Sequence, residues 1–416
     1  MPGFRLKSLS RALLAFIKGH SMPVAHRSCP ICNHKQVHAL HTQRFELPEG
    51  HPLSNGYDVV VCLKCGFVYA DTTVTQTDYD RFYAEHSKYE DATTGTGGIE
   101  NPFDWNRQME TARQIADFLQ DKNARVLDIG CANGGMLKAL SGLGYQSLCG
   151  IDPSPVCVEN TQRLGMEAHV GSLFEPFHEH AFDCVILSHT LEHIQDVRGA
   201  LDWINDRLRP DGIVYLETPD ANRYPDFIYA PFQDFNTEHI NHFSLVCLEN
   251  LMCQKGFALM EGQSKTLIAG PKIFYPAVYG FWKQTDGNVG ALIHDQDLRK
   301  SIEEYIKRSK EILNEIEVRL QKILTNSPKI IVWGTGQLTM KLLTETSLAR
   351  ATILAFVDNN PINQGKVLRG MSIIAPNQLD NLNVPIVVAT LLHHHAIADQ
   401  ILQMQLPNEI IFLAEE

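Results

Sequence analysis

The chain has 416 residues, of which 44% are hydrophobic and 20% are charged, so we expect a globular protein of two or three domains. Its 48 acidic residues outnumber its 36 basic residues and give a net charge of -12, which argues against a nucleic-acid partner, because that binding needs a concentrated basic face. No apolar stretch is long enough to cross a bilayer, so we expect no transmembrane segment.

The first 25 residues combine basic charge with a short apolar run. Arg5, Lys7, Arg11 and Lys18 flank the run ALLAFI at 12–17. This run is short for a secretory signal, and no convincing cleavage site follows it. We therefore expect residues 1–25 to be an N-terminal extension, either a weak surface helix or disordered. Weak contact of residues 1–20 with a membrane surface stays open, and Met22 offers an alternative start.

Two Cys-x-x-Cys pairs follow, within a segment of short strands and turns at 26–90. The four cysteines are Cys29, Cys32, Cys62 and Cys65. Each pair places two thiolates on a tight turn, and two facing turns complete a tetrahedral site for Zn²⁺. Four sulfur ligands leave no position for water, so we expect this zinc to be structural.

The other six of the ten cysteines are scattered through apolar segments. Free cysteines in such places behave as small buried hydrophobic residues. This pattern fits a reducing compartment better than a disulfide framework, so we expect a cytoplasmic protein.

An apolar strand runs into a turn of small residues at 125–137. Asp128 lies on the strand, and Gly130, Ala132 and Gly134 form the turn before a helical stretch. Small residues bring the backbone close to a ligand, and the first amides of a helix donate hydrogen bonds to it. We expect all four residues to contact a nucleoside cofactor, although their spacing departs from the dinucleotide fingerprint G-x-G-x-x-G.

Further strand ends agree with this interpretation. Asp152 ends the next strand, about 20 residues downstream, where a carboxylate can accept both hydroxyls of a ribose. Ser172 and Leu173 follow the third strand, and Ser188 lies at the end of the fourth. The turn before the fifth strand reads LRPDG.

The order of these motifs resembles that of the class I S-adenosylmethionine-dependent methyltransferases. The resemblance implies a catalytic domain over 100–294, with S-adenosylmethionine as cofactor and Ser172, Leu173 and Ser188 among its contacts. A nicotinamide dehydrogenase is the alternative, but LRPDG is not expected of that fold.

The segment TEHINHFS at 237–244 lies just after the fifth strand, at the edge where substrate groups gather in open α/β sheets. With the paired cysteines and a second Rossmann-like domain, it resembles the sugar C-methyltransferase family. Those enzymes methylate a nucleotide-linked deoxysugar after proton abstraction next to a keto group. The resemblance implies that His239 is the base, that Glu238 orients it, and that His193 is a second histidine near the substrate. His242 is expected to pack or to contact substrate.

One position departs from the family pattern. A tyrosine often stands three residues before the base, whereas this chain has Asn236. The departure keeps O-methylation of a sugar or another polar metabolite open beside C-methylation. A non-catalytic assembly or regulatory protein is a third possibility, although intact Asp128 and Asp152 speak against it.

In the last third of the chain, apolar residues at helical spacing predict a linker helix at 295–327. A Rossmann-like domain is predicted at 328–416. In that domain Gly334 and Gly336 form a second glycine turn, and Asp358 ends the following strand. The resemblance implies that these three help to hold the nucleotide of the substrate; a purely supporting domain is the alternative. The sequence thus predicts an α/β protein with a methyltransferase fold between a zinc module and a second Rossmann-like domain.

Overall fold

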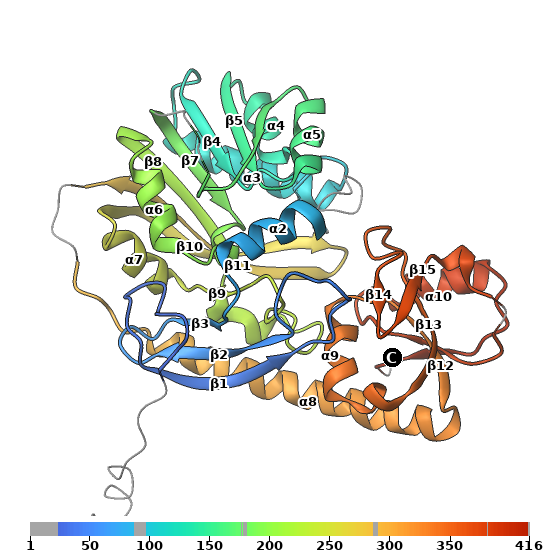
Figure 1. Cartoon of the computed structure of the whole chain (residues 1–416). Coiled ribbons are helices and arrows are strands. Elements are labelled where there is room, and N and C mark those ends of the chain that lie inside the picture. The colour runs from blue at the N-terminus through green and yellow to red at the C-terminus, as the bar shows by residue number, and fades with distance from the viewer. Residues whose placement is uncertain are drawn as a thin grey trace, which may run out of the picture.

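The computed structural model describes residues 24–86, 97–175, 177, 181–285, 290–380 and 382–414. The predicted N-terminal extension lies almost entirely outside them. Three sheets follow one another in space, and the predicted α/β class is confirmed (Figure 1). Within the described ranges, none of the helices combines the length and the apolarity needed to span a membrane.

The N-terminal sheet is antiparallel and borrows a strand from far along the chain. In spatial order it consists of β1 (Val37–Arg44), β2 (Gly56–Cys62), β3 (Val68–Asp71) and β9 (Asn241–His242). In the β3–β9 ladder, Tyr69 pairs with Asn241 and Val68 pairs with His242. Helix α2 (Gln76–His86) follows β3. Buried residues of this module and of the central domain form one continuous core, so the module is not a separate globule.

The central sheet has seven strands in the order β10-β11-β8-β7-β4-β5-β6. Its strands are β4 (Arg125–Ile129), β5 (Ser147–Asp152), β6 (Glu167–Val170), β7 (Phe182–Ser188), β8 (Leu208–Pro219), β10 (Phe257–Gly270) and β11 (Ile273–Gln284). Its helices are α3 (Pro102–Phe118), α4 (Gly135–Gly142), α5 (Pro155–Arg163), α6 (Val197–Asn205) and α7 (Leu245–Cys253). Strands β4 to β8 are mutually parallel, whereas β11 runs antiparallel to β8 and to β10.

The strand order reverses between β4 and β7, because β5 and β6 lie on one side of β4 while β7 and β8 lie on the other. Connections leave such a point in opposite directions and open a crevice at the carboxyl ends of the strands. Both strands are almost wholly buried, as expected of apolar runs covered by helices on both faces. The site is therefore expected at the ends of β4, β5 and β7.

Helix α8 (Gln296–Asn326) confirms the predicted long helix, with Asp295 as its N-cap and Ser327 as its C-cap. Its first half places Leu298, Ile302, Tyr305 and Ile306 in the core of the zinc module and the central domain. Its second half places Ile316, Leu320 and Ile323 in a core of the C-terminal domain. In Figure 1 the helix runs beneath the N-terminal sheet and the C-terminal domain. The segment predicted as a linker is thus part of two cores.

The C-terminal sheet has the order β14-β15-β13-β12-β16-β17, and β14 alone of the six runs antiparallel to its neighbour. Its strands are β12 (Lys329–Trp333), β13 (Thr352–Val357), β14 (Val367–Leu368), β15 (Met371–Ile374), β16 (Ile386–Val388) and β17 (Ile410–Phe412). Its α-helices are α9 (Gln337–Glu345) and α10 (His394–Gln403). The predicted second parallel α/β sheet is therefore present.

Candidate functional site

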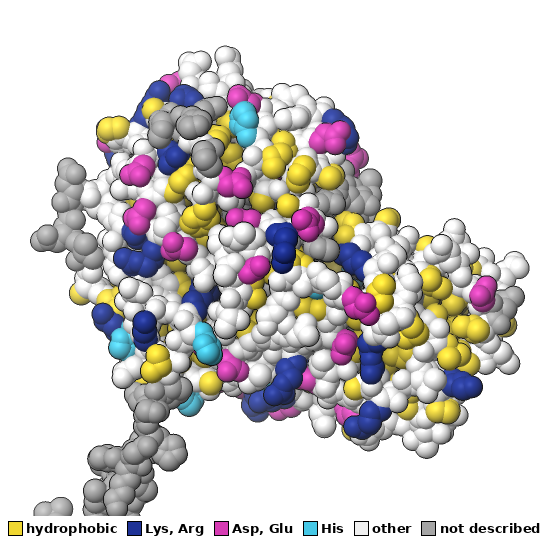
Figure 2. Space-filling model, in the orientation of Figure 1, with side chains coloured by type: hydrophobic (Ala, Val, Ile, Leu, Met, Phe, Trp, Pro, Cys, Tyr) yellow, Lys and Arg dark blue, Asp and Glu magenta, His cyan; other side chains and the backbone are white. Residues whose placement is uncertain are grey.

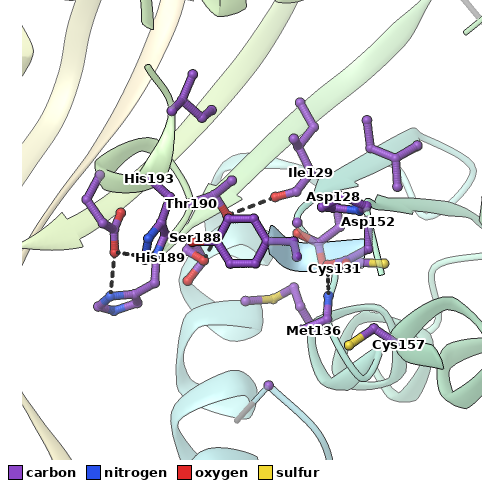
Figure 3. Close-up of a pocket in the computed structure, with 18 of the residues that line it drawn as sticks. Asp128, Ile129, Cys131, Met136, Asp152, Cys157, Ser188, His189, Thr190 and His193 are labelled. Carbon is purple, nitrogen blue, oxygen red and sulfur yellow. Dashed lines mark hydrogen bonds and ion pairs between the residues drawn. The ribbon is translucent and has the colours of Figure 1, made fainter. Parts of the chain in front are cut away.

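A cavity of about 340 Å³ opens at the carboxyl ends of β4, β5 and β7 (Figure 3). Its size is that of a small-molecule site. The predicted cofactor residues that line it are Asp128, Gly130, Ala132, Asp152, Ser172, Leu173 and Ser188. His193 and His239 line the same cavity. The structure thus brings seven of the eight predicted cofactor residues and both predicted catalytic histidines to one space.

The turn after β4 needs small residues for steric reasons. Gly130 has φ +73°, and a Cβ there would lie 2.6 Å from the hydroxyl of Thr190. Gly134 has φ +77°, and a Cβ there would lie 2.9 Å from the side chain of Thr161. Gly134 does not line the cavity but precedes the first residue of α4. The close approach of Thr161, on α5, therefore explains the glycine at position 134. The predicted contact of Gly134 with the cofactor stays a prediction.

Asp152 stands at the end of β5 with its carboxylate held by two backbone amides. The N–H groups of Ala132 and Ser154 donate to it, each at 2.9 Å. Burial raises the pKa of Asp152 to about 6. Burial, and then the charge of Asp152, raise the pKa of the neighbouring Asp128 to about 7. A buried carboxylate that faces a cavity fits the ribose hydroxyls of a nucleoside.

These pKa values predict a pH dependence of cofactor binding. The ionised carboxylate of Asp152 accepts ribose hydroxyls, whereas the protonated acid loses that capacity in part, so binding favours the ionised form. Affinity for S-adenosylmethionine should therefore be constant well above pH 6 and fall below it, by up to about 10-fold per pH unit for one proton. Calorimetric titrations between pH 5 and pH 8 check this, and a flat profile would contradict it.

The other end of the cavity carries two histidines from separate segments. His193 lies in a 3₁₀ turn after β7 (Leu191–His193), and its ring meets that of His239 edge to face with 4.9 Å between centroids. The ring of Tyr83, on α2, lies 5.8 Å from that of His193. His193 Nδ1 is 3.1 Å from the backbone carbonyl of Glu238. Because a carbonyl can only accept, Nδ1 carries the proton and Nε2 is left as the lone-pair nitrogen.

Asn236 holds the backbone of this segment. Its Oδ1 accepts hydrogen bonds from the N–H groups of Glu238 and His239, both at 2.8 Å. The hydroxyl of Tyr57, on β2, donates to the carbonyl of Asn236 at 2.7 Å. The residue that departs from the family pattern therefore positions His239 through the main chain.

Two predicted residues of this segment do not line the cavity. Glu238 is buried, and what it offers to His193 is its carbonyl. His242 is fully buried on β9, where its ring lies 4.8 Å from that of Phe235. Burial lowers the pKa of His242 to about 3, so it is neutral. Of the two expectations for His242, its position favours packing over substrate contact.

Sequence reasoning assigned no role to His189, Glu192 or Glu217. His189 has φ +54° and lines the cavity, with Nδ1 3.5 Å from Glu192 Oε1 and Nε2 3.0 Å from Glu217 Oε1. Burial opposes a charge on this ring, but the two carboxylates outweigh it and raise the pKa of His189. Burial likewise opposes ionisation of Glu217, yet Lys265 and His189 hold its pKa well below the usual range. His189 and Glu192 are sequence neighbours of the predicted Ser188 and His193, but their mutual geometry did not follow from the sequence.

Arg27 connects the N-terminal module that carries the four cysteines to both histidine segments. Its guanidinium donates to the carbonyls of Ile194, Gln195 and Ile240 and to the side chain of Asn241. Burial lowers its pKa to about 10, so it stays charged at neutral pH. A cation two residues before Cys29 thus fixes the backbone next to His193 and next to His239.

Replacing this cation should destabilise the protein. In Arg27→Met the carbonyls at 194, 195 and 240 lose a buried donor, which we expect to lower the free energy of unfolding by about 3 kcal/mol. Urea denaturation checks this, with Arg163→Met, in an exposed pair with Glu159, as the control of unchanged stability. Equal stability of the two variants would show that Arg27 does not hold the segments together.

The four predicted zinc ligands form one cluster. The sulfur atoms of Cys29 and Cys65 are 3.5 Å apart, as are those of Cys32 and Cys62. Four sulfurs at 2.3 Å from one ion lie at similar separations, so the thiols fit a tetrahedral site.

We expect freshly isolated protein to contain about one zinc per chain, by metal analysis. Cys62→Ser should release it and loosen the N-terminal sheet, because metal binding and folding are coupled in such modules. Cys184→Ser, at a buried cysteine in the central sheet, serves as the control that should retain zinc. Protein that contains no zinc would contradict the assignment.

The glycine turn of the C-terminal domain lies outside the cavity. Gly334 has φ +97°, and Asp358 accepts hydrogen bonds from both the N–H and the hydroxyl of Thr335. Gln337, at the start of α9, donates to the hydroxyl of Thr237 at 2.9 Å. The turn with Gly334 and Gly336 is thus next to the segment that carries His239, and its predicted nucleotide contact stays a prediction.

Fold and site together define a class I S-adenosylmethionine-dependent methyltransferase domain. The family model described as "Methyltransferase domain" matches residues 103–261, and the one described as "C2185-like, N-terminal" matches residues 326–412. The chain therefore carries a methyltransferase domain followed by a C2185-like domain.

Curated relatives match about three tenths of the chain. The tRNA U34 carboxymethyltransferase of Shewanella sp. (strain ANA-3) is 31% identical over 129 residues, 29% of this chain and 39% of that protein. The protein of the same name from Cellvibrio japonicus (strain Ueda107) is 31% identical over 143 residues, 32% of this chain and 44% of that protein. The match thus spans about two fifths of the relatives' length.

Solved structures match about half of the chain. A S-adenosylmethionine-dependent methyltransferase from Clostridium acetobutylicum ATCC 824 has a TM-score of 0.35 and 9% identity, over 44% of this chain and 92% of that one. A chain from the complex between the Haloferax volcanii Trm112 methyltransferase activator and the putative methyltransferase has a TM-score of 0.38 and 15% identity. The match covers 50% of this chain and 97% of that one.

Proposed function

We propose that this protein transfers a methyl group from S-adenosylmethionine to a sugar nucleotide or a related activated glycan precursor. The observation that carries the proposal is the single cavity with Asp152 at one end and His193 and His239 at the other. Figure 3 shows Asp128 and Asp152 grouped apart from His189 and His193. One end thus suits a nucleoside, and the other suits an acceptor that must lose a proton.

In this proposal the acceptor is a carbon next to a keto group, and His239 removes its proton. S-adenosylmethionine supplies a methyl group on a sulfonium sulfur, ready for direct displacement. A neutral imidazole is a suitable base near pH 7, and the main chain around Asn236 fixes its position. Proximity matters as much as basicity, because the displacement needs acceptor, methyl and sulfur in line.

O-methylation of a sugar or another polar metabolite is the second candidate. The observation that favours it is Asn236, whose side chain is engaged with two backbone amides where the family often has a tyrosine. A phenol that could stabilise an enolate is therefore not supplied by this position. A hydroxyl acceptor needs a base but no such group.

The curated relatives are named for tRNA, which makes RNA a third acceptor to test. The net charge of -12 opposes it. In Figure 2 basic and acidic side chains are interspersed on the face shown, whereas RNA binding favours a gathered basic surface.

Thermal shift against a panel of sugar nucleotides, with S-adenosylhomocysteine present, tests the proposal. A sugar nucleotide at 100 times its Kd should add about 2.7 kcal/mol to the free energy of unfolding, whereas the free sugar, the free nucleotide or tRNA should not. Ligands that shift the transition are then assayed for transfer of a labelled methyl group. Labelling of tRNA, with none of any sugar nucleotide, would overturn the proposal.

A further inference from the structure

We propose that Glu192, His193 and His239 bind a divalent cation at the acceptor end of the cavity. The three side chains line the cavity, and their ligand atoms lie within 4.8 Å of one another. Two imidazoles and one carboxylate form a familiar ligand set for Mn²⁺, Fe²⁺, Co²⁺ or Zn²⁺ that leaves open positions. The site is separate from the four cysteines, whose sulfurs leave no open position.

The carboxylate of Glu192 is the first argument. It is 1% exposed, and in the described part of the chain neither of its oxygens has a hydrogen-bond partner within normal geometry. Its nearest nitrogen neighbours are His189 Nδ1 at 3.5 Å and His193 Nε2 at 3.8 Å. A buried carboxylate without close donors is costly, and a cation beside it would offset that cost.

The tautomer of His193 is the second argument. Its Nδ1 donates to the carbonyl of Glu238, so the neutral ring presents the lone pair of Nε2. That lone pair is 3.8 Å from the negative oxygen of Glu192, an arrangement that is repulsive unless a proton or a cation lies between them. Donation from one ring nitrogen to a carbonyl is also how proteins usually orient a metal-bound histidine.

The distances are of the order that one shared ion requires. Ligand atoms at about 2.2 Å from the same ion lie no more than about 4.4 Å apart. The 3.8 Å between Glu192 Oε1 and His193 Nε2 meets this limit. His239 offers its ligand atom within 4.8 Å of the other two.

Such a cation deepens the proposed function and rests on it for its substrate. Its open positions would face the cavity, where they could take the keto or hydroxyl oxygen of the acceptor and make the neighbouring proton more acidic. His239 would then act as a ligand, and the proton of the acceptor would pass to the pair of His189 and Glu217, of which His189 lines the same cavity. The methyl group transferred would be the same, but the rate would depend on the cation.

Manganese binding to zinc-loaded protein tests the site without any substrate. Titration followed by the electron paramagnetic resonance signal of free Mn²⁺ should reveal about one bound ion per chain, as thiolate-held zinc is not displaced by this weaker metal. Glu192→Gln and His239→Asn should each weaken binding by at least about 10-fold. Glu249→Gln, at a partly buried glutamate of α7 outside the cavity, is the control and should bind as the original chain does.

Each result decides the proposal. No binding up to millimolar Mn²⁺, or equal binding by both ligand variants and the control, would overturn it. Glu192→Gln can disturb folding because the side chain is buried. His239→Asn changes a partly exposed side chain and therefore provides an independent test of metal binding. If protein that a chelating resin has stripped of every metal except its zinc methylates at the full rate, the cation site is rejected and the proposed function stands. If the protein binds manganese but methylates no sugar nucleotide, the cation site stands and the proposed function is rejected.

Discussion

Asp152→Ala is expected to weaken the binding of S-adenosylmethionine by at least about 100-fold. The carboxylate lies at the end of β5, faces the cavity and is fixed by the amides of Ala132 and Ser154. Hydrogen bonds to a charged acceptor contribute about 1.5–3 kcal/mol each, and two ribose hydroxyls would lose theirs. A loss of about 3 kcal/mol corresponds to roughly 100-fold in Kd. Calorimetry measures the change.

Two controls separate a lost ligand contact from a damaged turn. Asp152→Asn keeps the size of the side chain and one acceptor oxygen, so we expect an intermediate loss. Glu159→Ala changes an exposed carboxylate on the following helix and should leave the affinity unchanged. If the alanine variant binds with the original affinity, Asp152 does not contact the cofactor.

His239→Asn is expected to lower turnover by about 100-fold or more, with the fold and cofactor affinity retained. General-base catalysis usually contributes 10²–10⁴-fold, and asparagine cannot accept the proton at neutral pH. The backbone of the segment should persist, because its N–H groups are held by Asn236. Methyl transfer at saturating substrate measures the change, and His169→Asn, at an exposed histidine, is the control of unchanged turnover.

The isotope content of the substrate separates the two acceptor types. If carbon is methylated, a substrate with deuterium at that carbon should exchange it with water, because the carbanion forms before transfer. An O-methyltransferase should show no exchange. Near-original turnover of the asparagine variant would show that His239 is not the base, and exchange without His239 would point to His193.

Local patterns predicted the central fold well. The apolar run that contains Asp128 and the one that ends in Asp152 are buried parallel strands, and the small residues that follow the first strand form the turn beside the cavity. Such segments follow from short-range rules: a buried strand needs an apolar run, and a turn against a ligand needs small residues. For the same reason the helix at 296–326 was predicted nearly to its ends.

Long-range geometry did not follow from the sequence. The pairing of Asn241 with Tyr69 joins segments more than 170 positions apart, and β9 is too short for a pattern to reveal it. The left-handed backbone of His189 is unusual for a residue with a Cβ, and its ring contacts carboxylates from two other elements. Glu192 directly precedes the predicted His193, yet only its burial beside two imidazoles distinguishes it from an ordinary surface glutamate.

Helix α8 has a consequence for how the molecule melts. Its two halves belong to different cores, but its backbone hydrogen bonds run without interruption from Gln296 to Asn326. Unfolding of the C-terminal sheet would therefore expose Ile316, Leu320 and Ile323 on a helix whose other half is still anchored. This continuity favours a single cooperative transition over two separate ones. It also means that a chain cut at residue 327 keeps an apolar stripe without its partner, so a cut inside the helix, near residue 312, should yield the better-behaved fragment.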